Sequence, residues 1–190
     1  MPLVLVHGGG TTIGTSFRYL LPLLPERRRI IEVGQGDAGD LASLLFYLGI
    51  GEADVLGFGD GGSAALQLAI LHPGLVNKLV VISTPCSDFC DDELRSIRAR
   101  ALLLSATEDI ITPEQAVRMS RMIAGSRLVI FPGRQDEVIG AMGSGLGGGY
   151  ADVVASLVNQ FLGPGLEASA RSIALRADKS PVHPSDAPLR

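Results

Sequence analysis

The turn around Gly59 is the part of the sequence with the clearest chemical meaning. The stretch ADVLGFGDGG at residues 53–62 is interpreted as a strand, near residues 54–57, that turns sharply into a helix, near residues 61–71. A strand, a sharp turn and a helix in this order are typical of a nucleophile elbow, whose G-x-S-x-G motif places a serine at its centre. Gly59 occupies the central position here and has no side chain that attacks a carbonyl carbon. The sequence therefore predicts the frame of a catalytic site without its nucleophile.

Three further segments accompany this turn in a fixed order. They are VLVHGGG at residues 4–10, ALLLSATEDIITP at residues 101–113 and LVIFPG at residues 128–133. With the elbow and its helix, these segments resemble the core motifs of the α/β-hydrolase fold family, in the compact form that lacks a large cap domain. The resemblance extends from residue 3 to about residue 162. It implies a fold, but by itself it does not imply an activity.

The resemblance also implies where a serine, histidine and acid triad belongs. The serine position is Gly59, the acid position is Asp109, and the histidine position is Gln135, or Asp136 if the loop is shifted by one residue. Serine attack needs a hydroxyl, a base that takes its proton and an acid that orients the base. Two of these three groups are substituted, so we expect a degenerate catalytic triad. None of the chain's three histidines is placed as a replacement for the missing base.

What survives in this interpretation is a ligand-binding surface built mainly from backbone groups. The family's oxyanion hole corresponds to the N–H groups of Gly9 and Asp60, and the surrounding site residues are His7, Gly8 and Phe58. Backbone donors do not depend on side-chain identity, so weak or different catalysis remains open. Two loops, residues 83–93 and the glycine-rich residues 140–149, are expected to shape the pocket.

The two cysteines offer two weaker interpretations of the same region. Cys86 and Cys90 have the spacing C-x₃-C, but a metal site needs a third and a fourth ligand, which the sequence does not supply. Cys86 as a substitute nucleophile lacks a histidine to activate it. We therefore expect no metal and no cofactor.

Composition narrows the class of protein. The chain has 190 residues, 46% hydrophobic and 19% charged, with a formal net charge of −4. This balance argues against a nucleic-acid partner, and the absence of an apolar run of about 18 residues argues against a membrane span. The N-terminal residues show no basic signal-peptide region, and two cysteines suit a reducing compartment. We expect a cytoplasmic protein with a small-molecule ligand, and a homo-oligomer remains open.

The coarse pattern alternates strands and helices. Strands are predicted at residues 3–6, 29–33, 54–57, 78–83, 101–105 and 128–131, and helices at 16–24, 40–48, 61–71, 113–124 and 150–162. Such alternation predicts a doubly wound α/β fold with a mostly parallel sheet of about six strands. Residues 1–164 are expected to form a single domain, and residues 165–190 a partly flexible tail.

Three functions fit these observations. The first is a pseudoenzyme that binds a small molecule or a partner. The second is a non-hydrolytic enzyme, such as a cyclase, lyase or isomerase, that uses the residual pocket and oxyanion hole. The third is an esterase-like hydrolase whose triad is misassigned or mutated.

Overall fold

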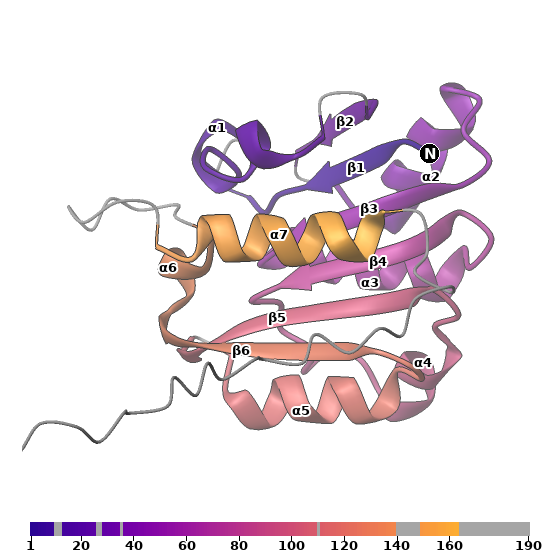
Figure 1. Cartoon of the computed structure of the whole chain (residues 1–190). Helices are drawn as coiled ribbons and strands as arrows, with labels where there is room; N and C mark the ends of the chain where they lie inside the picture. Colours follow the sequence, from indigo (N-terminus) through magenta and orange to yellow (C-terminus); the bar gives the residue numbers. More distant parts are fainter. Residues whose placement is uncertain (10–12, 26–27, 35, 110, 140–148, 164–190) are drawn as a thin grey trace, which may run out of the picture.

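The protein is built on one six-stranded parallel sheet (Figure 1). The computed structural model describes residues 1–9, 13–25, 28–34, 36–109, 111–139 and 149–163. The strands are β1 (Leu3–Val6), β2 (Ile30–Val33), β3 (Ala53–Phe58), β4 (Val76–Ile82), β5 (Arg100–Glu108) and β6 (Arg127–Arg134). Their order in the sheet is β2-β1-β3-β4-β5-β6. All six predicted strands and the α/β fold class are confirmed.

Helices cover both faces of the sheet. They are α1 (Ile13–Ser16), α2 (Ala38–Tyr47), α3 (Asp60–Leu71), α4 (Asp91–Ser96), α5 (Pro113–Met122), α6 (Gln135–Ile139) and α7 (Ala151–Leu162), with a 3₁₀ turn η1 at Leu21–Leu23. Helix α7 crosses one face, and α2, α3 and α5 lie on the other (Figure 1). The four predicted helices at residues 40–48, 61–71, 113–124 and 150–162 are confirmed as α2, α3, α5 and α7.

Alternate side chains of each strand enter two separate hydrophobic cores. On β1, Val4 and Val6 pack with α2, α3 and α5, whereas Leu3 and Leu5 pack with α7 and the segment around Phe17. Strands buried on both faces read as continuous apolar runs rather than as alternating ones. This explains why short runs such as LVLV marked the strands in the sequence.

The predicted helix at residues 16–24 is wrong. The chain forms the four-residue helix α1, a turn and the 3₁₀ turn η1 over this region. Pro22 is the physical reason, because a proline inside a helix lacks the N–H that bonds the preceding turn and its ring clashes with the carbonyl four residues before it. In η1 the proline lies in the first turn, where no N–H partner is required.

The parallel arrangement places the carboxyl ends of β1, β3, β4 and β5 at one edge of the sheet. Open α/β sheets bind ligands at this edge, where the strand order reverses. Here β1 lies between β2 and β3, so the loop after β1 and the turn after β3 flank the reversal. Within the described residues, no helix is long and apolar enough to cross a membrane. The predicted glycine-rich loop, apart from Gly149, and the predicted tail at 165–190 lie outside the described residues.

Candidate ligand site at the strand-to-helix turn

Gly59 joins β3 directly to α3 in a conformation that side chains rarely adopt. Its φ is 56° and its ψ is −126°, and it immediately precedes the first residue of α3. Its N–H donates to the carbonyl of Ile82 on the neighbouring strand at 3.0 Å. A Cβ atom placed on Gly59 meets no atom within 4 Å. The turn therefore has a backbone conformation that would strain a residue with a side chain, as in a nucleophile elbow, and it leaves room for a side chain that the sequence does not supply.

The two glycines that flank this position are required by close packing. A Cβ atom on Gly57 lies 2.5 Å from the Cα of Gly62, and one on Gly61 lies 2.3 Å from the carbonyl oxygen of Val6. Both separations are shorter than any ordinary contact, so α3 approaches the sheet only because side chains are absent here.

A small pocket opens at this turn. Its volume is about 190 Å³, and its lining comprises Gly8, Gly9, Phe58, Gly59, Asp60, Ser83, Pro85, Ile111 and Gln135. Six of these nine residues were predicted as site residues from the sequence. The other three, Ser83, Pro85 and Ile111, were missed as individual positions, although Ser83 and Pro85 belong to the loop that was expected to shape the pocket.

The lining offers two backbone N–H groups. Within the described residues, neither the N–H of Gly9 nor that of Asp60 makes a hydrogen bond. The loop after β1 lies close to the start of α3. A Cβ atom added to Gly8 would lie 3.1 Å from the Cβ of Asp60. The N–H of Asp60 also carries the partial positive charge of the N-terminus of α3. These groups are suited to donate hydrogen bonds to a carbonyl oxygen of a ligand.

Asp109 lies next to this pocket but not on its lining. Its Oδ1 accepts a hydrogen bond from the Ile111 N–H at 3.3 Å. Its Oδ2 is buried and has no hydrogen-bond partner among the described residues. A buried acceptor without a donor is unfavourable, and in a triad this second oxygen takes the ring N–H of the histidine.

Gln135 begins α6 directly after β6 and brings its side chain to the pocket. Its amide makes no hydrogen bond among the described residues. The backbone of Asp136 follows in α6, and its side chain is outside the described part of the structure. The choice between these two residues as the histidine position therefore stays a prediction.

His7 does not lie on the pocket lining. Its Nδ1 donates to the Gly8 carbonyl oxygen at 3.0 Å, and its Nε2 faces Gly34. The residue lines a neighbouring hollow together with Asp37 and Asp40. His72 ends α3 at the far end of that helix. Among the described lining residues there is thus no histidine.

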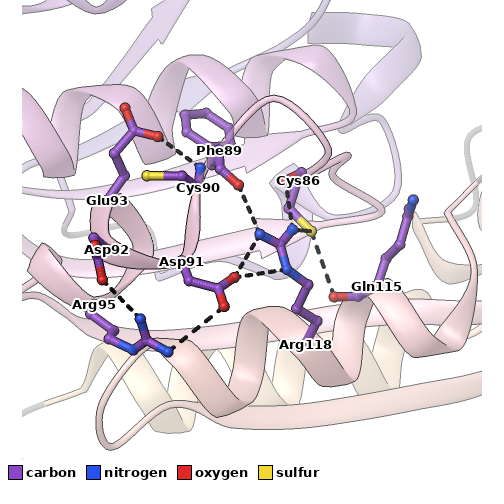
Figure 2. A network of polar contacts seen from close by, with 9 residues as sticks. All are labelled: Cys86, Phe89, Cys90, Asp91, Asp92, Glu93, Arg95, Gln115 and Arg118. Carbon is purple, nitrogen blue, oxygen red and sulfur yellow. Dashed lines mark hydrogen bonds and ion pairs between the residues drawn. The ribbon is translucent and has the colours of Figure 1, made fainter.

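Residues 83–93 form the loop that carries Pro85. Arg118 of α5 makes hydrogen bonds to this loop at Cys86, Phe89 and Asp91 (Figure 2). The guanidinium donates to the Asp91 carboxylate at 2.7 Å and 3.0 Å, and to the carbonyl oxygens of Cys86 at 3.3 Å and Phe89 at 2.9 Å. One planar side chain thus spans three points of this loop, which favours a single loop geometry.

Cys86 of this loop is not suited to act as the substitute nucleophile. Cys86 is fully buried, and burial raises the pKa of its thiol against the opposing effect of Arg118. A thiol in this state is a poor nucleophile, and Cys86 is not on the pocket lining. No group of three side chains suited to bind a metal occurs in the described part of the chain.

A six-stranded parallel sheet in this order, with helices on both faces and a positive-φ turn after β3, defines the fold of the chain, which is the α/β-hydrolase fold. Solved structures share this fold: an enol-lactonase from Burkholderia xenovorans LB400 superimposes with a TM-score of 0.70 at 16% identity, over 85% of this chain and 91% of that one. A carboxylesterase from Bacillus subtilis gives a TM-score of 0.71 at 16% identity, over 85% and 83% of the two chains.

Two curated relatives are closer in sequence. A pimeloyl-[acyl-carrier protein] methyl ester esterase from Yersinia enterocolitica is 31% identical over 53% of this chain and 43% of its own length. A 2-hydroxymuconate semialdehyde hydrolase from Pseudomonas sp. is 33% identical over 44% of this chain and 36% of its own length. The matches span less than half the length of these relatives. No family model matches the sequence.

Proposed function

We propose that this chain is a non-hydrolytic α/β-hydrolase-fold protein, a pseudoenzyme that binds a small molecule in the pocket at Gly59. The observation that carries the proposal is the contrast within one site. The turn has a positive φ at Gly59 and two N–H groups without a partner among the described residues, yet position 59 has no side chain and none of the described lining residues is a histidine. Efficient serine hydrolysis needs both of those groups.

The pocket supports binding of a carbonyl compound. Its N–H donors suit a carbonyl oxygen, and its apolar side chains of Phe58, Pro85 and Ile111 suit a short carbon chain. A volume of about 190 Å³ suits a small molecule. One curated relative is named as a methyl ester esterase and the other as a semialdehyde hydrolase. Esters and semialdehydes both contain a carbonyl group.

A second candidate is a non-hydrolytic enzyme such as a cyclase, lyase or isomerase. The two unpaired N–H groups favour it, because preorganised donors stabilise a developing oxyanion without a covalent intermediate. Such an enzyme converts its ligand to a product that contains no added water, which separates it from both a binder and a hydrolase.

An esterase with a misassigned triad is the third candidate, and Ser83 is the residue that it would use. Ser83 lies on the pocket lining and is the only serine there among the described residues. A serine hydroxyl needs a neighbouring base, and the described lining offers a glutamine and an exposed aspartate instead of a histidine. We therefore place this candidate behind the other two.

Binding without conversion is the expected result when the protein is titrated with methyl butyrate and followed by NMR. Pocket amides should shift saturably, and the ester should remain intact overnight. Gln135→Trp fills the pocket and should abolish the shifts, whereas Gln67→Trp, on the exposed face of α3, should not. Release of butyrate would establish hydrolysis, a rearranged product would favour the second candidate, and the absence of saturable shifts would refute the binding proposal.

A further inference from the structure

Ser83 has a backbone conformation that no other described residue except glycine adopts. Its φ is 49°, and its N–H donates to the Leu104 carbonyl oxygen at 2.8 Å, which fixes it at the carboxyl end of β4. Residues with a Cβ atom are strained in this left-handed region. Strain of this kind persists where the surrounding structure imposes it, and it is concentrated at functional sites.

The side chain of Ser83 has a second unfavourable feature. The residue is 3% exposed, and its hydroxyl has no hydrogen-bond partner among the described residues. Buried hydroxyls are nearly always paired, because an unpaired one loses its bonds to water without replacement. Ser83 lies on the pocket lining, which places this unpaired hydroxyl on a residue beside the pocket.

The charges around the pocket limit the class of that ligand. Asp60 is the only charged side chain on the described lining, and the half-buried Asp109 carboxylate precedes the lining residue Ile111 by two positions. No lysine or arginine is among the described lining residues. A carboxylate ligand would lie beside the Asp60 carboxylate, and near that of Asp109, with no lysine or arginine on the described lining to offset them, and like charges at short range repel each other. The site therefore favours an uncharged ligand.

We propose that the pocket binds a small uncharged amide or ester, and that the Ser83 hydroxyl recognises the heteroatom attached to its carbonyl carbon. The N–H groups of Gly9 and Asp60 then hold the carbonyl oxygen, and Ser83 bonds the amide nitrogen or the ester oxygen. This inference rests on the proposed binding function. It assigns to Ser83 a role in ligand specificity that the resemblance to the α/β-hydrolase fold family does not imply.

Three compounds of six non-hydrogen atoms test the proposal: butyramide, 2-pentanone and butyrate. They have similar shapes, and the ketone lacks the heteroatom while butyrate carries a charge at neutral pH. Their dissociation constants are measured by NMR titration. We expect butyramide to bind the wild-type protein about five- to tenfold more tightly than 2-pentanone, because one hydrogen bond to a buried hydroxyl distinguishes them. Butyrate should bind most weakly.

The matched control is Ser105, which is also 3% exposed with an unpartnered hydroxyl but lies on β5 away from the pocket lining. Ser83→Ala should remove the preference for amide over ketone, and Ser105→Ala should keep it. Ser83→Gly removes the same hydroxyl and tolerates the positive φ, so it should bind like Ser83→Ala but melt at a higher temperature.

An equal affinity of the wild-type protein for amide and ketone, or an amide preference that survives both Ser83 variants, would overturn the role of Ser83. Tighter binding of butyrate than of butyramide would overturn the ligand class. In each of these cases the pocket still binds a small molecule, so the proposed function stands. If none of the three compounds nor methyl butyrate binds, the binding function itself is wrong, and this inference fails with it.

Discussion

Esterase activity should appear when a serine at position 59 and a histidine at position 135 are introduced together. Gly59 offers free space for the serine side chain, Gln135 lies on the same pocket, and the Oδ2 of Asp109 is without a donor among the described residues. Triad members act as a unit, so each substitution alone lacks its partner. We expect hydrolysis of p-nitrophenyl acetate by the double variant to exceed that of either single variant by about a hundredfold or more.

Two controls decide how this result is interpreted. Gly59→Ser combined with Gln67→His places the histidine on the exposed face of α3 and should remain inactive. Gly59→Ser combined with Asp136→His tests whether the histidine position is one residue later. If both the 135 and the 136 pairs are inert while circular dichroism shows them folded, the oxyanion site has been remodelled, and the plain binder gains over the non-hydrolytic enzyme.

Gly61→Ala should destabilise the protein more than Gly59→Ser does. The new methyl group meets the Val6 carbonyl oxygen at 2.3 Å, so α3 must move away from the sheet, and overpacking of this kind costs about 3 kcal/mol. Gly59→Ser has free space around it and is strained only by its φ of 56°, so it should cost about 1–2 kcal/mol.

Urea denaturation measures both changes, with Gly51→Ala as the control. A Cβ atom on Gly51 meets nothing within 4 Å and its φ is not positive, so the midpoint should stay close to that of the wild-type protein. A Gly59→Ser midpoint at or above the wild-type value would show that the turn accommodates a side chain without strain. The proposed strain at position 59 would then be wrong. A Gly61→Ala midpoint near that of Gly51→Ala would refute the close packing of α3.

The sequence was most informative where one local rule determines the structure. Residues 53–61 identified β3, the elbow and the start of α3, because a buried strand followed by spaced glycines has few alternatives. The same holds for LVLV at β1 and RALLLSATE at β5, because each contains a run of apolar residues long enough to specify a buried strand. The prediction of a helix at 16–24 was wrong because it followed the apolar residues and did not account for Pro22. A proline in the interior of a helix disrupts the backbone more strongly than apolar spacing favours it.

Ser83 and Ile111 could not be assigned to the site in advance. The φ of Ser83 arises from the way that the end of β4 is held against β5, which is a tertiary effect without a sequence motif. Ile111 reaches the lining because the chain turns back after Asp109. His7 was placed near the site by its sequence neighbours, yet the ring turns toward Gly34, because side-chain direction depends on packing that no local pattern encodes.

The absence of an activated nucleophile is tested most directly by a fluorophosphonate and intact-mass spectrometry. The reagent reacts covalently with serine hydroxyls that a neighbouring base activates. Wild-type protein incubated with excess reagent should keep its unmodified mass, and the Gly59→Ser, Gln135→His variant should gain one adduct at residue 59. Stoichiometric labelling of the wild-type protein, at Ser83 or at any other residue, would show an activated nucleophile and contradict the proposed loss of serine chemistry.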